Sequence, residues 1–205
     1  MKHRVIDFLG VIVLALLLAV PVSGQDHPTA LKAADAEVDP MQTVMEQYMV
    51  PGPEHKRLAE FVGEWNCKAL MWMEPGGEPM ETVGEAVNRL ILGGRYLYSE
   101  YTSTFMGQPF NGIGITGYDR FNGKYVSMWI DTLSTGMYLS AGTYGAGDNP
   151  AEDFGVMDDY LAGGQVKVRN VTTLIDHNTH KFDMYITGPD GKEFKNMEMV
   201  YTRKK

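Results

Sequence analysis

The strongest constraint on the fold is a change of hydrophobic period at Trp65. Ahead of Trp65 the apolar residues recur at helical spacing, whereas after it they alternate with polar residues almost to the end of the chain. Turn-forming residues such as Asn122-Gly123 and Pro189-Asp190-Gly191 separate the alternating segments. No helical segment interrupts them, which excludes a fold of alternating strands and helices. The pattern therefore predicts an all-β protein.

About ten strands are expected, and their connections decide between a sandwich and a barrel. The predicted strands are Trp65–Met73, Thr82–Leu92, Arg95–Phe105, Phe110–Tyr118, Lys124–Asp131, Gly136–Tyr144, Phe154–Leu161, Val166–Ile175, Lys181–Thr187 and Glu193–Tyr201. Strands joined in sequential hairpins leave two exposed edges unless the sheet closes on itself. We therefore predict a closed up-and-down antiparallel β-barrel.

A short helical part is expected ahead of the barrel, at about 40–62. Asp39 is placed to cap a first helix over 40–49 that has proline at its first position. A second helical segment over 54–61 carries apolar side chains that face a core, and we expect it to close one end of the barrel. The predicted single domain therefore spans 40–205.

The N-terminal residues 1–24 have the composition of a secretory signal peptide. A basic start is followed by an apolar run from Phe8 to Val22 and by small residues before Gln25. The run has about 15 residues, whereas a membrane-spanning helix needs about 20. We expect an exported protein, periplasmic or extracellular, with no stable membrane anchor after cleavage. The polar segment 25–39 is expected to form a disordered arm.

Charge and cysteine content narrow the possible partners. Without residues 1–24 the chain holds 16 basic and 25 acidic residues, a net charge of about -9. Such a surface repels phosphate backbones, so nucleic acid is excluded as a partner. Cys67 is the only cysteine, which leaves no internal disulfide, and we expect it to be a buried apolar residue of the first strand.

Three local motifs suggest chemistry, but their settings argue against it. The glycines of Gly112-x-Gly114-x-x-Gly117 precede a turn and a strand, so bending of the strand or close approach of a large aromatic fits better than nucleotide binding. His177 and His180 could clamp a metal or reach a haem, yet they fall in a polar segment that predicts a solvated turn. The acidic stretch 148–159 lacks the spacing of a calcium loop and is expected to be solvated. We expect no metal, no cofactor and no catalytic motif.

Several short motifs follow one another in a fixed order between Pro53 and Lys204. They are Pro53-Glu54-His55, Phe61-Val62-Gly63-Glu64-Trp65, Gly93-Gly94-Arg95-Tyr96-Leu97, Pro109-Phe110-Asn111-Gly112, Gly117-Tyr118-Asp119, Trp129-Ile130-Asp131, Gly142-Thr143-Tyr144, Gly188-Pro189-Asp190-Gly191-Lys192 and Tyr201-Thr202-Arg203-Lys204. In this order they resemble the bacterial family called domain of unknown function 1579. The resemblance implies a lipocalin-like (calycin) barrel, often in exported proteins, and it implies no established activity.

Three neighbouring predicted strands each carry one aliphatic face and one face of aromatic and polar residues. Two arrangements fit: the aliphatic face fills the barrel, or the aromatic-polar face lines a cavity. We favour the second. The candidate ligand-binding residues are then Tyr98, Glu100, Trp129, Asp131 and Tyr138, with Arg89 or Arg169 as the counter-charge.

Three functions are compatible with such a barrel. The leading one is a non-catalytic binder of an apolar or amphipathic small molecule. An enzyme would need Glu100 or Asp131 inside the barrel as a buried carboxylate beside a second titratable group. A scaffold or interaction protein of the cell envelope would have a filled barrel and an exposed apolar patch, for which the methionines of the first helix are candidates. The pattern favours no oligomeric state.

Overall fold

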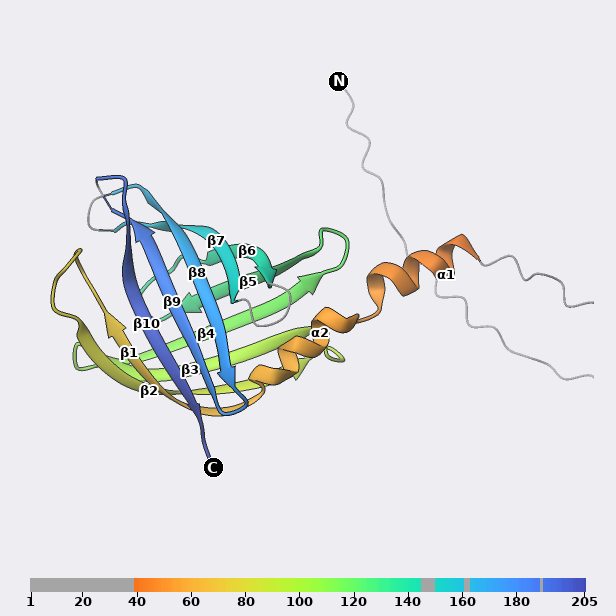
Figure 1. The fold of residues 1–205 in the computed structure, drawn as a ribbon, viewed down its shortest axis with the longest axis horizontal. Helices are drawn as coiled ribbons and strands as arrows, with labels where there is room; N and C mark the ends of the chain where they lie inside the picture. The colour runs from red at the N-terminus through yellow and green to blue at the C-terminus, as the bar shows by residue number, and fades with distance from the viewer. Residues whose placement is uncertain (1–38, 145–149, 161–162, 189) are drawn as a thin grey trace, which may run out of the picture. The chain divides into compact units, whose positions relative to one another are not determined.

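The computed structural model describes residues 39–144, 150–160, 163–188 and 190–205 (Figure 1). The predicted signal peptide at 1–24 lies outside these residues, as does the predicted arm at 25–39 apart from its last residue. Residues 145–149 also lie outside them, so the first two residues of the predicted acidic stretch, 148 and 149, are not described.

Ten antiparallel strands form a closed barrel in which β1 pairs with both β2 and β10 (Figure 1). The strands are β1 (Gly63–Met71), β2 (Met80–Ile91), β3 (Tyr96–Phe105), β4 (Gln108–Asp119), β5 (Lys124–Asp131), β6 (Tyr138–Tyr144), β7 (Ala151–Asp158), β8 (Gln165–Asp176), β9 (Thr179–Thr187) and β10 (Glu193–Arg203). Every strand pairs with its neighbours in the sequence, so closure by β1 and β10 removes both edges. The predicted up-and-down barrel is confirmed.

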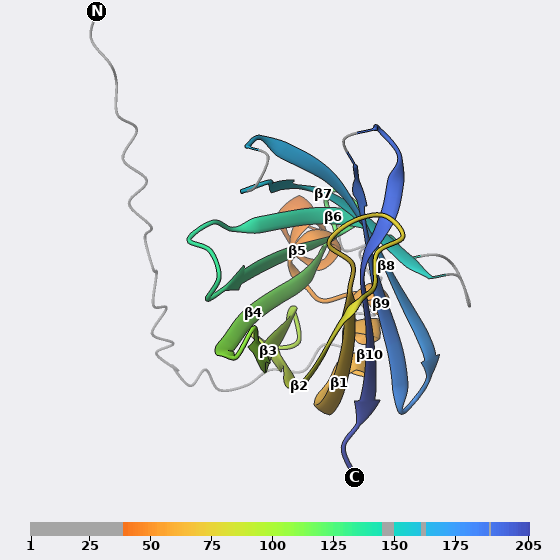
Figure 2. The ribbon, with the colours of Figure 1, turned by 90° about the vertical axis from the view of Figure 1, so that its left-hand side faces the viewer.

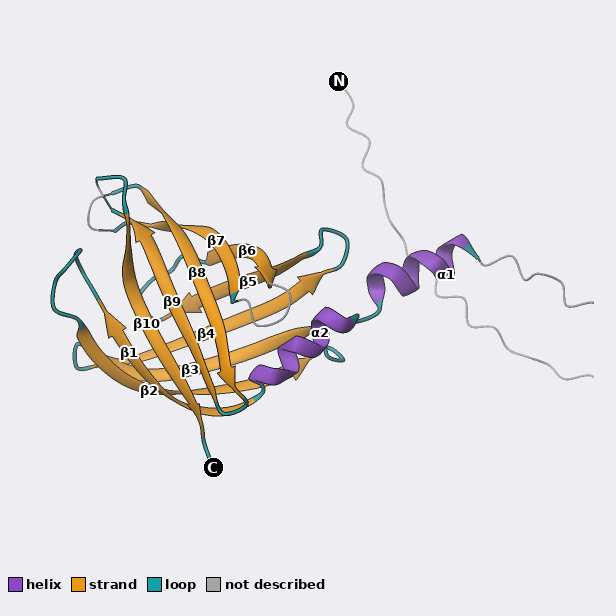
Figure 3. Ribbon diagram, viewed as in Figure 1, coloured by secondary structure: helices purple, strands orange, loops and turns teal. Residues whose placement is uncertain are grey.

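Short helices precede the barrel, as Figure 3 shows. Helix α1 (Pro40–Val44) continues as a π-helical turn, η1 (Met45–Met49), and α2 (Pro53–Leu58) continues as a 3₁₀ turn, η2 (Ala59–Phe61). The carboxylate of Asp39 accepts a hydrogen bond from the Met41 amide at 2.9 Å, which confirms the predicted N-cap. In the described part of the chain, no helix has both the length and the apolar character needed to cross a membrane.

Helix α2 and turn η2 close one end of the barrel. Leu58 and Phe61 are buried in a cluster with Leu97 of β3 and Tyr125 of β5. The Phe61 carbonyl accepts hydrogen bonds from Trp65 Nε1 at 3.0 Å and from an amide of β2, Asn88 Nδ2, at 2.9 Å. In Figure 2 the helical segments are seen behind the ring of strands. The expectation that this segment closes one end of the barrel is confirmed.

The packed part of the interior lies next to this plug, on the side of β1, β2 and β10. Trp65 is fully buried, and the cluster around it also contains Cys67, Ala69, Ala86, Tyr101 and Met199. Burying each large apolar side chain contributes roughly 1.5–3 kcal/mol, so this side anchors the barrel. Burial raises the pKa of the Cys67 thiol to about 12, which agrees with the predicted role of Cys67 as a buried apolar residue.

Candidate functional site

Beyond the packed side, the barrel encloses a cavity of about 1510 Å³. Ligand pockets usually have volumes of about 300–1,000 Å³, so side chains leave an unusually large space unfilled. The cavity opens at the end of the barrel opposite α2, where the β1–β2, β5–β6, β7–β8 and β9–β10 connections line its mouth. Alternate residues of the strands form its wall, because side chains of a strand point to opposite faces.

Trp129 of β5 dominates the aromatic part of the wall. Its ring lies against Gly112 and Gly114 of β4: a Cβ atom at Gly112 would overlap the indole, and one at Gly114 would lie 3.4 Å from it. Trp129 Nε1 donates a hydrogen bond to Asp131 Oδ2 at 2.8 Å, which fixes the ring. Tyr101 lies 6.4 Å from Trp129 between ring centroids. The predicted close approach of an aromatic to the alternating glycines is confirmed.

A polar cluster, formed by Tyr138, Ser140, Asp153 and Asn170, lies on the cavity wall across β6, β7 and β8. Asp153 and Asn170 are directly opposite in the register of β7 and β8. Asn170 Nδ2 donates to Asp153 Oδ1 at 2.7 Å and to the Tyr138 hydroxyl oxygen at 2.9 Å. Ser140 hydrogen-bonds Asp153 as well. The cluster is therefore a connected network on an otherwise largely apolar wall.

Burial changes the acidity of two members of the polar cluster. It raises the pKa of the Asp153 carboxyl, although the hydrogen bonds from Ser140 and Asn170 work against it. It also raises the pKa of Tyr138 above that of an ordinary tyrosine. Asp153 is thus the carboxylate that this wall holds away from water.

Our sequence interpretation missed Asp153, because it placed the start of the strand at Phe154 and assigned Asp153 to the acidic loop. Strand β7 in fact begins at Ala151, so Asp153 points into the cavity, whereas the Glu152 carboxylate lies on the outer face beside Arg169. The alternation of Ala151, Asp153 and Gly155 is the signal that would have found it.

His180 corrects another expectation. Only His177 lies in the turn, whereas His180 belongs to β9 and is 4% exposed. The His180 ring stacks on Tyr201 with 4.2 Å between centroids and meets Trp65 edge-on at 4.4 Å. Desolvation, aided by the nearby Arg203 cation, lowers the pKa of His180 to about 4. Among the described residues no group of three histidine, cysteine or acidic side chains is placed to hold a metal ion.

Three of the seven candidate ligand-binding residues lie on the cavity wall: Trp129, Asp131 and Tyr138. They come together because Trp129 and Tyr138 are opposite each other on β5 and β6, and Asp131 is bonded to Trp129. Their role in binding stays a prediction.

Three other candidates, Arg89, Tyr98 and Glu100, face outward, so the prediction that they line the cavity is wrong. Arg89 lies over the Tyr98 ring at 4.2 Å and 3.8 Å from the Glu100 carboxylate. The reason is the alternation of β3, whose buried residues are Leu97 and Tyr101. Leu97 packs against the plug, and Tyr101 lies beside Trp129. Residues one position away then necessarily face solvent.

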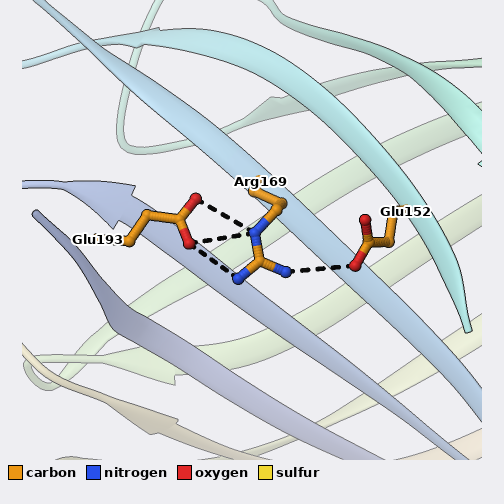
Figure 4. A network of polar contacts seen from close by, with 3 residues as sticks. All are labelled: Glu152, Arg169 and Glu193. Atoms are coloured by element: carbon orange, nitrogen blue, oxygen red, sulfur yellow. Dashed lines mark hydrogen bonds and ion pairs between the residues drawn. The ribbon is translucent and has the colours of Figure 1, made fainter.

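Arg169 is the seventh candidate, and it also faces outward rather than into the cavity. Its guanidinium lies 2.8 Å from Glu193 and 3.4 Å from Glu152, as Figure 4 shows. It also lies over the ring of Tyr185, 4.2 Å from the centroid. The neighbouring residues Val168 and Asn170 take the inward positions of β8 and are buried. Arg169 is therefore a cross-strand link on the outer surface, where the carboxylates keep it charged.

The sequence and the fold are similar to those of known proteins. A family model described as "Protein of unknown function (DUF1579)" matches residues 50–203. The crystal structure of Rv2717c from M. tuberculosis is similar in fold, with a TM-score of 0.56 and 15% identity, over 76% of this chain and all of that one. A redesigned β-barrel matches 72% of this chain and 95% of its own chain, with 15% identity and a TM-score of 0.38. No curated protein matches the chain.

Proposed function

The chain belongs to the DUF1579 family, whose function is unknown, and we propose that it binds an amphipathic small molecule inside the barrel. The observation that carries this proposal is the open cavity of about 1510 Å³, whose wall is mostly apolar and aromatic and includes the hydrogen-bonded polar cluster. Sites for small molecules combine these two features: apolar area supplies the affinity and a few polar groups fix the orientation. A barrel built only for stability would be filled with side chains.

Binding is favoured over the two alternative functions. Acid–base catalysis needs a second titratable group near Asp153 with a suitable pKa, and burial instead raises the pKa of Tyr138. A scaffold role would use the apolar face of α1 and η1, where Met41 and Met45 are exposed. A barrel that serves only as a scaffold is expected to have a filled interior, so the large cavity favours binding over that role.

We also propose that the protein is exported, on the basis of the N-terminal sequence pattern. Sequencing the N-terminus of the protein recovered from its own cells tests this. A first residue at Gln25 supports export, whereas an intact residue 1 overturns it.

The binding proposal is tested with Nile red, a neutral dye whose emission rises and shifts to the blue in apolar surroundings. Ser99 and Thr172 are inward residues on the cavity wall, so S99W/T172W places two large rings in the cavity. The matched control T102W/T173W adds the same rings to the outer face of the same strands, β3 and β8. We expect saturable dye binding by the natural protein and the control, and much weaker binding by S99W/T172W. Dye binding that is absent, or equal in all three proteins, would refute the proposal.

A further inference from the structure

The barrel separates positive from negative charge. Within the part of the chain that the structure describes, no arginine lines the cavity, and Lys167 reaches only its mouth, from an exposed position on β8. Carboxylates do line it: Asp153 lies on the wall, and the mouth carries Glu74, Asp131 and Asp158. His180 is held neutral near pH 7. Among the described residues, Asp153 therefore faces the cavity with no cation beside it, and a cleft lined mostly by carboxylates focuses a negative potential.

The polar cluster has hydrogen-bond acceptors whose capacity its own donors do not fill. Asn170 is 3% exposed, and its amide nitrogen already donates to both Asp153 and Tyr138. Its amide oxygen, Asn170 Oδ1, has no hydrogen-bond partner among the described residues, and it is shielded from the cavity, so a ligand reaches the Asp153 carboxylate and not this oxygen. A buried acceptor left unpaired costs about 1–3 kcal/mol. The Asp153 carboxylate accepts from Asn170 and Ser140, and a carboxylate has room for about four donors.

The Asp153 carboxylate is the acceptor of this cluster that a ligand reaches, and its pairing with Asn170 across β7 and β8, through a 2.7 Å hydrogen bond, holds it in place. A ligand group that suits this carboxylate must donate hydrogen bonds, and it must tolerate or match a negative charge. A protonated amine does both, because an ammonium group has only donors and carries positive charge. A carboxylate head would meet Asp153 with no cation beside it, which is unfavourable in a cavity shielded from water.

We infer that the ligand is a cationic amphiphile, in which an ammonium head binds at the Asp153 carboxylate and an apolar body lies along the wall around Trp129. This inference rests on the proposed function and specifies the chemical class of its ligand. The acidic mouth adds to the selection, because it attracts cations on their way into the barrel and repels anions. An unpaired charge is costly to bury, so the ammonium and the carboxylate stabilise each other inside the barrel.

The experiment compares three probes that share one tail and differ only in the head group. Dodecylamine, dodecanol and dodecanoate are titrated into the full chain by calorimetry at pH 7, below their aggregation concentrations. We expect the amine to bind about 10- to 100-fold more tightly than the alcohol, the range for a hydrogen-bonded charged group, and the acid to bind most weakly. This comparison within the natural protein needs no variant to fold.

A variant then assigns the selection to one residue. D153N removes the charge and keeps the shape, and we expect the ratio of the amine's affinity to that of dodecanol to fall towards one, whatever the affinity for dodecanol itself becomes. E100Q makes a comparable change of charge at an exposed position on the outer face of β3, so it should keep the full preference.

Three results would overturn the inference: no binding by any of the probes, acid binding at least as tightly as amine, or a preference for the amine that survives in D153N. The Nile red measurement separates these from failure of the proposed function. If the dye enters the barrel and the amine shows no advantage, binding stands and the cationic head group is refuted. If neither the dye nor any probe binds, both are refuted.

Discussion

His180 makes a quantitative prediction about stability in acid. Its pKa is about 4 in the folded protein, against an ordinary histidine value of 6.5 when the chain is unfolded. As the pH falls below 6.5, the unfolded chain therefore takes up a proton that the folded protein refuses, and stability is lost until the pH reaches about 4. Each pH unit of this gap is worth about 1.4 kcal/mol, so the predicted loss is about 3 kcal/mol by pH 4.

The measurement is urea unfolding, followed by tryptophan fluorescence at pH 7 and at pH 4, of the natural protein and of H180Q. Other carboxylates also titrate in this range, so the quantity of interest is the difference between the two proteins. We expect H180Q to be less stable at pH 7, because it loses the ring contacts to Tyr201 and Trp65, yet to lose about 3 kcal/mol less on acidification.

The matched control is H177Q, because His177 is exposed in the turn between β8 and β9, close to His180 in the sequence. H177Q should lose the same stability as the natural protein. Equal losses in the natural protein and H180Q would refute the buried, neutral His180 on which the description of this end of the barrel depends.

Four further predictions follow from the packing and the charges. G112A should lower the free energy of unfolding by about 1–3 kcal/mol, because its methyl group overlaps Trp129; urea unfolding measures this. L58A should cost about 2–5 kcal/mol by the same assay, since Leu58 is 1% exposed in the plug. R169A should cost no more than about 1 kcal/mol and leave Nile red binding intact, because Arg169 is on the outer surface. D153N should raise the melting temperature at pH 7 but not at pH 3, because the raised pKa of Asp153 makes its ionisation unfavourable to folding as the pH rises above 3.8.

Most of the barrel could be predicted because its local signals agree. Alternation from Trp65 onward, turn residues between segments and the Asp39–Pro40 helix start all indicated the same architecture, and each is a local property of the chain. Closure followed from the cost of leaving two edges unpaired. The plug was predictable as well, since Leu58 and Phe61 share a helical face that has to be buried.

The residues that line the cavity were harder to predict, because alternation separates the two faces of a strand without indicating which one points inward. On β5 and β6 the aromatic-polar face lines the barrel, with Trp129 and Tyr138, whereas on β3 the inward face carries Tyr101 and leaves Tyr98 outside. The choice depends on packing across strands that are distant in sequence, such as Tyr101 beside Trp129. Arg169 was misplaced for the same reason: its partner Glu193 lies on β10, beyond any local pattern.

Asp153 was missed through an error in one boundary. A strand start placed three residues late moved it from the wall of the barrel into a solvated loop. Strand ends are set by pairing with neighbours, here Ala151 with Thr172, and such a pairing is not visible in a single segment.

The central claim is that the open interior of this barrel binds an amphipathic molecule, and native mass spectrometry of the full chain incubated with Nile red tests it most directly. The account predicts a one-to-one adduct with the natural protein and with the T102W/T173W control, and a bare S99W/T172W variant. A bare natural protein, or an adduct of equal abundance in all three proteins, would contradict it.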